Sequence, residues 1–304
     1  MQNARLARRI YQHWQLYVFL LLPVVYFAYW PMFGLQLAFK KFTPRLGIWG
    51  SPWIGMKNFN KFFASYQFQR VLTNTLRLSF YSILAGFPIP IAFALMLNSM
   101  RSQRYKKIIQ TVTYMPHFIS VVVLVGMVIQ IFHPMMGLYG YFYGLFNNGA
   151  HPADLMGDSS AFPHLYVWSG IWQTFGWGSI IYMAALASVN MELHEAAEID
   201  GASRFQRVLH VDLPAILPTV TIMLILRAGQ VMAVGFEKAF LMQNNLNLRT
   251  SEVISTYVYK VGLASATSDF AYSTAIGMFN SVVNMLMIVT VNALSRKLSE
   301  TSLW

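Results

Sequence analysis

Long apolar stretches alternate with shorter polar segments along the whole chain. Six of these stretches are long enough to cross a bilayer, because a spanning helix needs about 20 apolar residues. They cover residues 16–39, 72–97, 109–132, 165–189, 216–242 and 273–294. Prolines interrupt the first stretch, and Pro88 and Pro90 predict a kink in the second. The pattern predicts an all-α integral membrane protein with six transmembrane helices.

The composition agrees with a membrane protein. Of the 304 residues, 56% are hydrophobic and 11% are charged, whereas a soluble domain carries about 25% charged residues. The net charge of +11 could indicate nucleic-acid binding. However, the basic residues are spread over loops between the apolar stretches, so we expect contact with anionic lipid headgroups and no nucleic acid. The absence of cysteine excludes disulfides and thiolate metal sites.

The orientation follows from the distribution of basic residues between short loops. The loop over 101–107 contains Arg101, Arg104, Lys106 and Lys107, whereas 133–164 contains neither lysine nor arginine. The loop after the first apolar stretch is also basic and runs against this trend. We expect both termini, and the loop over 190–215, to face the cytoplasm.

The expected organisation has four parts. Residues 1–15 form a cytoplasmic N-terminal segment, because the first apolar stretch is too long for a cleavable signal peptide. Residues 16–71 contain the first span and an external loop. A core of five spans over 72–294 includes the cytoplasmic loop 190–215, and 295–304 form a cytoplasmic tail.

The loop 190–215 has the pattern of two helices joined by a tight turn. Strong helix formers run to Ile199, Asp200-Gly201 is a turn signal, and Ser203 can cap a second helix. Pro214 then sets the entry into the next span. Small alanines and segregated charges favour a docking element. The alternative is an amphipathic loop that rests on lipid headgroups.

The motif within this loop resembles the EAA loop of permease subunits from bacterial ABC importers. The resemblance rests on Glu195-Ala196-Ala197, Gly201 and Val211-x-Leu213-Pro214. Valine stands at 211 where the family usually has isoleucine, which keeps the position apolar. In that family the loop inserts into a groove on the ATP-hydrolysing subunit and couples the two subunits. The resemblance assigns this docking role to Glu195, Ala196, Ala197, Asp200, Gly201, Leu213 and Pro214.

Further stretches are similar to permeases of bacterial multiple-sugar and polysaccharide importers, namely 31–40, 50–59, 235–238, 252–259, 279–284 and 300–304. The resemblance implies a type I importer in the bacterial cytoplasmic membrane. Its other components would be a second, different permease, two ATPase subunits and an extracellular or periplasmic solute-binding protein. The chain itself would need no cofactor, since ATP and Mg²⁺ are bound by the ATPase subunits.

The sequence lacks the residues that several other functions of membrane proteins require. No aspartate or glutamate falls in the middle of a predicted span, as ion-coupled transporters and intramembrane aspartyl proteases require. There is no G-x-x-x-x-G-K-[ST] phosphate loop, so ATP hydrolysis must reside in a partner. His117 has no second metal ligand near it in sequence and is expected to pack between helices. We therefore expect no catalytic residues and no metal site.

Two sets of polar residues and one arginine are candidates for a solute pathway. Arg227 lies deep in a predicted span, where a charge costs about 2.5–3.5 kcal/mol unless it faces protein or water. Asn280 and Asn284 share one helix face, and Trp172 and Gln173 lie in the fourth span. Amides and aromatic faces suit a sugar. The alternatives are helix packing for the polar sets and a structural link for Arg227.

Together these features predict a permease subunit that imports oligosaccharides or polysaccharide fragments by alternating access. An ABC permease for a non-sugar solute is one alternative, and a polytopic membrane scaffold or enzyme is another.

Overall fold

A computed structural model describes residues 13–299, with side chains described as far as Arg296. The predicted N-terminal segment before residue 13 and the tail from residue 300 lie outside the described residues. Within the described range the regular elements are all helices. The chain folds as two compact units. One comprises Met1–Ser65 and Val258–Phe279, and the other comprises Tyr66–Tyr257 and Asn280–Trp304.

The first unit begins with a long apolar helix whose pitch changes along its length. It runs as α2 (Trp14–Val24), continues as the π-helical turn η1 (Val25–Tyr29), and tightens into the 3₁₀ segment η2 (Trp30–Phe39). Pro23 and Pro31 lie within this run. Proline lacks the N–H that the α-helical ladder needs, so the hydrogen bonds change register around it.

The remainder of this unit joins the predicted first external loop to the start of the sixth span. It contains α3 (Gly47–Gly50), α4 (Lys57–Phe63), η5 (Lys260–Ala264) and the part of α18 (Phe270–Ser299) that ends at Phe279. Phe59 packs with Ala38 and Ala275, and Lys61 forms a 3.0 Å ion pair with Asp269. The side-chain amide of Asn58 donates to the carbonyls of two residues at the end of η2, Ala38 (2.9 Å) and Lys40 (3.1 Å).

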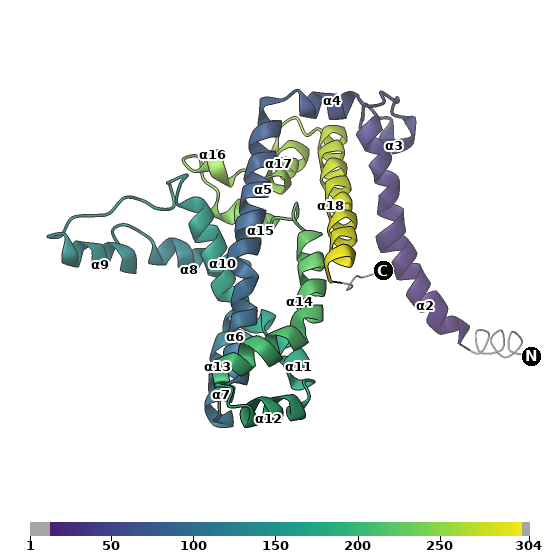
Figure 1. Cartoon of the computed structure of the whole chain (residues 1–304). Helices are drawn as coiled ribbons and strands as arrows, with labels where there is room; N and C mark the ends of the chain where they lie inside the picture. Colours follow the sequence, from purple (N-terminus) through teal and green to yellow (C-terminus); the bar gives the residue numbers. More distant parts are fainter. Residues whose placement is uncertain (1–12, 300–304) are drawn as a thin grey trace, which may run out of the picture. The chain divides into compact units, whose positions relative to one another are not determined.

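The second unit holds most of the helices. They are α5 (Tyr66–Gly86), α6 (Pro88–Asn98), α7 (Gln103–Tyr114), η3 (Met115–Phe118), α8 (Val121–Ile131), α9 (Leu138–Phe146), α10 (Phe162–Gly178), α11 (Ile180–Ala187), α12 (Met191–Ile199), α13 (Arg204–Arg207), η4 (Val208–Asp212), α14 (Leu213–Ala228), α15 (Phe236–Met242), α16 (Leu248–Ser251), most of α17 (Ile254–Tyr259) and the part of α18 that starts at Asn280. In Figure 1, α5 and α6 form one long rod, and α10 and α11 pack against it. Two buried clusters hold these helices together. One centres on Leu78, Phe162 and Val253, and the other on Tyr182 and Ile216.

Among the described residues, four helices are long and apolar enough to cross a membrane, covering Trp14–Phe39, Tyr66–Asn98, Arg204–Ala228 and Phe270–Arg296. A fifth span results if the bent pair Gln103–Phe118 and Val121–Ile131 counts as one, with a bend of 100°. This bend follows Pro116, and Ser120 restarts the helix by accepting a hydrogen bond from the Val123 amide at 3.3 Å. The number of six spans stays a prediction.

The predicted fifth span, 216–242, is divided in the structure. Helix α14 ends at Ala228, and α15 begins only at Phe236. Non-helical backbone inside a membrane protein needs hydrogen-bond partners from other segments. Two side chains supply them here. Asn284 accepts from the Met232 amide at 2.9 Å, and the Ser79 hydroxyl donates to the Val231 carbonyl.

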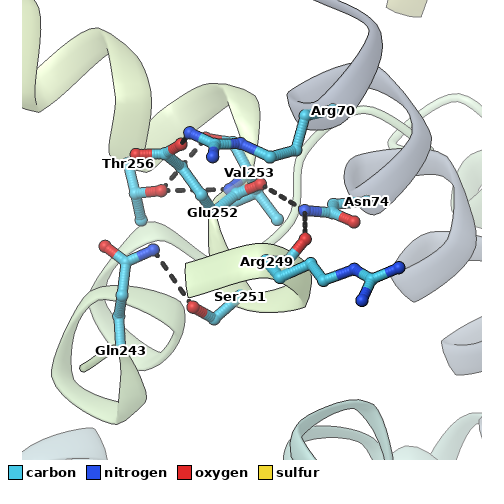
Figure 2. A network of polar contacts seen from close by, with 8 residues as sticks. All are labelled: Arg70, Asn74, Gln243, Arg249, Ser251, Glu252, Val253 and Thr256. Carbon is cyan, nitrogen blue, oxygen red and sulfur yellow. Dashed lines mark hydrogen bonds and ion pairs between the residues drawn. The ribbon is translucent and has the colours of Figure 1, made fainter. Parts of the chain in front are cut away.

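The segment after α15 is fastened to the start of α5 by a polar network (Figure 2). Arg70 forms an ion pair with the buried carboxylate of Glu252. Asn74, one turn further along α5, donates to the carbonyls of Arg249 and Glu252, each at 3.0 Å. The segment between the predicted fifth and sixth spans therefore contains short helices, and α5 holds part of its backbone.

Candidate functional site: a polar loop and a cationic cavity

The polar loop predicted over 190–215 begins with helix α12, which has a defined end at each terminus. The Asn190 side chain caps its start by accepting from the Glu192 amide at 3.0 Å. Gly201 follows its end with a φ of +77°. The amides of Gly201 and Ala202 bond back to the carbonyls of Glu198 (3.1 Å) and Ala197 (2.9 Å). This is a Schellman motif, and it confirms the predicted turn at Gly201.

The second helix of the loop starts at Ser203, as the sequence predicts. Ser203 and Gln206 exchange side-chain-to-backbone hydrogen bonds, which forms a capping box. Helix α13 then passes through η4 into α14 without a break, so the chain is helical from Arg204 to Ala228. Pro214 does not interrupt this run. It comes directly after the π-helical turn η4, where the register of the backbone hydrogen bonds changes.

One face of α12 holds the helix against the rest of the unit. His194 and Glu198 are four residues apart and therefore lie on the same face. His194 Nε2 lies 3.2 Å from Asp212 Oδ1, and Glu198 pairs with Arg207 at 2.9 Å. Asp212 is 3% exposed and also accepts from the side-chain amide of Asn98, at the end of α6, at 3.3 Å.

The opposite face of the loop is open. Glu195, Ala196 and Asp200 are exposed, and Ala197 is half-buried. Large apolar side chains stand beside them, with Ile199 86% exposed and Phe205 72% exposed. Exposed apolar side chains surrounded by charged residues are typical of a protein-binding surface. At the far end of the loop, Pro214 is exposed, whereas Leu213 is half-buried against the Ile216 cluster.

The second unit also contains a partly open cavity of about 340 Å³. Helices α5, α8, α10 and α15 line it, together with the end of α14 and the segment that follows it. Its volume lies in the range of about 300–1,000 Å³ that is common for ligand sites. The polar lining residues are Ser79, Ser82, Tyr166, Gln173, Thr174, Arg227, Gln230 and Lys238.

The cavity brings together two of the five predicted pathway residues, Arg227 and Gln173. Trp172, Asn280 and Asn284 are not among its lining residues. Gln173 also donates to the Ile119 carbonyl at 2.8 Å, and so ties α10 to the bend before α8. The Asn280 side-chain oxygen is buried and has no hydrogen-bond partner among the described residues. Trp172 is exposed on α10.

Sequence reasoning missed Lys238 as a cavity residue. Lys238 falls near the end of the predicted fifth span, where a lysine is expected to extend towards water. The structure instead places it in the cavity, because the chain turns between α14 and α15. The signal that was available is the pair Gly229 and Gly235, which flank that turn. His117 lies elsewhere and stacks on Trp177 with ring centres 4.6 Å apart.

The fold and the loop together define a polytopic, all-helical membrane permease. The chain belongs to the family of binding-protein-dependent transport system inner membrane components, whose sequence pattern matches residues 86–300. This confirms the resemblance found in the sequence and places the chain among transport subunits rather than enzymes.

Relatives and solved structures agree with this assignment. Protein LplB of Bacillus subtilis is 38% identical, covering 95% of this chain and 91% of that protein. The polygalacturonan/rhamnogalacturonan transport system permease protein YteP of Bacillus subtilis is 36% identical, covering 100% and 94%. A bacterial ABC transporter involved in the import of the acidic polysaccharide alginate contains a chain with 38% identity and a TM-score of 0.87, covering 97% of this chain and 99% of that one.

Proposed function

We propose that this chain is a permease subunit that imports oligosaccharides or polysaccharide fragments by alternating access. The observation that carries the proposal is the cavity in the second unit, whose lining combines hydroxyls, amides and basic side chains. Its similarity to a polygalacturonan/rhamnogalacturonan permease and to a chain of an alginate importer supports a carbohydrate as the solute. In this reading Arg227 and Gln173 line the solute pathway, and Trp172, Asn280 and Asn284 are further candidates.

The loop would couple the permease to ATP hydrolysis in a partner. Its exposed face offers Glu195, Ala196 and Asp200 to an ATPase subunit, with Ala197, Gly201, Leu213 and Pro214 shaping the surface. Helix α14 supports a mechanical link, because it starts in this loop and carries Arg227 in its last turn. Its 16 residues span about 24 Å at 1.5 Å per residue. A tilt of α14 driven at the loop would therefore move the wall of the cavity.

The proposed assembly contains a second, different permease, two ATPase subunits and an external solute-binding protein. The similarity to a chain of an alginate transporter crystallised with its periplasmic protein supports the last of these. ATP and Mg²⁺ would be bound by the ATPase subunits. The proposed location is the bacterial cytoplasmic membrane, with both termini and the coupling loop on the cytoplasmic side.

The test is the ATPase activity of the purified complex with its binding protein, measured against neutral and acidic oligosaccharides. We expect stimulation by one of these classes and concentrative uptake of the same sugar into proteoliposomes. A complex that retains its ATPases but responds to no sugar would overturn the carbohydrate assignment. A chain that purifies without any ATPase would overturn the permease role in favour of a scaffold.

A second candidate solute is an organic phosphate. The sn-glycerol-3-phosphate permease UgpA of Pectobacterium atrosepticum is 25% identical over 92% of this chain, and a cationic cavity would also suit that anion. Glycerol 3-phosphate therefore belongs in the same panel, and stimulation by it alone would select this alternative.

A further inference from the structure

Two basic side chains and no acidic one line the cavity. Arg227 and Lys238 both line it, and none of its lining residues is an aspartate or a glutamate. A buried cation is stable only when it is paired or hydrogen-bonded. Neither side chain forms an ion pair within the described part of the chain. The cavity is therefore complementary to an anion.

The Lys238 side chain is held in place by Tyr166, and its ammonium has further hydrogen-bond donors available for a ligand. It is 9% exposed, and its Nζ donates to the Tyr166 carbonyl at 2.7 Å. The same ammonium lies 4.8 Å from the centre of the Tyr166 ring. A side chain at Gly170 would bring its Cβ within 3.0 Å of Nζ, so the glycine makes room for the ammonium. An ammonium has three donor hydrogens, and the Tyr166 bond uses one of them.

Arg227 approaches the cavity from a different element. It lies in the last turn of α14, where the helix dipole favours a cation. Its side chain is exposed to the cavity rather than packed in the core. A guanidinium presents a planar fork of donors that matches a carboxylate with two parallel hydrogen bonds.

We propose that Lys238 and Arg227 form a carboxylate subsite that selects uronate-containing sugars over neutral ones. The proposal rests on the proposed function and adds the charge of the solute and the residues that recognise it. Gln230, Ser82 and Thr174 line the same cavity and can meet the hydroxyls of the sugar ring. A site with these neutral groups around a cation pair suits an acidic sugar better than a bare inorganic anion.

The test compares an oligogalacturonide with its methyl ester, which has the same sugar rings without the charge. Uptake into proteoliposomes is measured for the complete transporter with saturated binding protein. For Lys238→Met we expect about tenfold lower uptake of the free acid, the usual effect of losing one charge-assisted hydrogen bond, and little change for the ester. Lys238→Arg should recover much of the acid uptake. Lys107→Met removes an exposed lysine outside the cavity and should leave both sugars unaffected.

Two further variants keep the test decisive if Lys238→Met does not assemble. Arg227→Gln alters an exposed side chain and should lower the ratio of acid to ester uptake. Gly170→Ala should also lower this ratio, because the added methyl group would crowd the ammonium of Lys238. Equal losses for acid and ester in all variants would show that the cations are structural and overturn the subsite. Wild-type transporter that imports neither sugar, with its ATPases bound, would overturn the proposed function itself.

Discussion

His194 on helix α12 pairs with Asp212 at the start of the following helix, with 3.2 Å between Nε2 and Oδ1. Asp212 is 3% exposed and also accepts a hydrogen bond from Asn98 at the end of α6. One buried carboxylate thus joins the loop over 190–215 to two helices of the unit. We therefore expect a displacement of α12 to be transmitted to α6 and α14 rather than absorbed within the loop.

We expect Asp212→Ala to reduce the coupling of ATP hydrolysis to uptake. The substitution removes the acceptor shared by His194 and Asn98, and an unsatisfied buried polar group costs about 1–3 kcal/mol. The ratio of solute imported to ATP hydrolysed should fall, because α12 can move without α14. This ratio is measured in proteoliposomes that contain the complete transporter.

A matched pair of variants at His194 serves as the control. His194→Gln keeps a side-chain donor for Asp212 and should largely preserve the ratio, whereas His194→Leu should lower it as Asp212→Ala does. If both variants lose uptake and ATP hydrolysis in the same proportion, the contact is needed for folding alone.

The effect of replacing Gly201 should depend first on whether the new residue adopts a positive φ, and second on the size of its side chain. Its φ of +77° is disfavoured for residues with a Cβ, but no heavy atom lies within 4 Å of a Cβ placed there. Gly201→Asn should therefore be mild, and Gly201→Ala should cost about 1–2 kcal/mol in the loop. The Gly201→Trp variant should insert into the membrane but lose solute-stimulated ATP hydrolysis, because the indole would occupy the proposed docking surface.

Thermal unfolding of the purified subunit separates these effects. The Asn variant should unfold close to wild type, and the Ala variant at a lower temperature. An active Gly201→Trp transporter would show that this turn does not face the ATPase.

Glu195→Lys should abolish solute-stimulated ATP hydrolysis without preventing insertion. Glu195 is exposed on the open face of α12, away from the His194 contact, so reversing its charge leaves the fold intact. The stimulated ATPase activity of the assembled complex is the measurement. Glu192→Lys is a comparison within the same helix, since Glu192 bonds to Asn190 at 3.0 Å and lies at the N-terminal cap. Full activity of Glu195→Lys would remove this residue from the docking surface.

The features that could be predicted well from the sequence are those that depend on neighbouring residues. The turn at Gly201 and the cap at Ser203 depend on residues within one helical turn, so their signals are complete in the sequence. The long apolar stretches likewise follow from bilayer thickness. The bend after Pro116 has the same local origin, although its angle of 100° does not follow from the sequence.

Long-range contacts explain what the sequence did not reveal. The break between Ala228 and Phe236 is stabilised by Ser79 and Asn284, which are far away in the chain. Hydropathy continues through 216–242 without a sign of this break, and so Lys238 was not expected in a cavity. Polar residues such as Gln173 and Asn284 could be recognised as important, but their backbone partners could not.

Gly176 should be hard to replace, because it allows the close packing of α10 against α7. A Cβ at this position would lie 2.2 Å from the carbonyl oxygen of Thr113, which is backbone of α7 and cannot rotate away. Gly176→Ala should therefore force α10 and α7 apart and destabilise the protein by about 1–3 kcal/mol, as overpacking does. Gly126→Ala in α8 is the matched control, because no atom lies within 4 Å of its added Cβ and alanine is the better helix former. Thermal unfolding of both variants in detergent should show a lower midpoint for Gly176→Ala and an unchanged or higher one for Gly126→Ala. Equal midpoints would mean that α7 and α10 are not in close contact in the membrane.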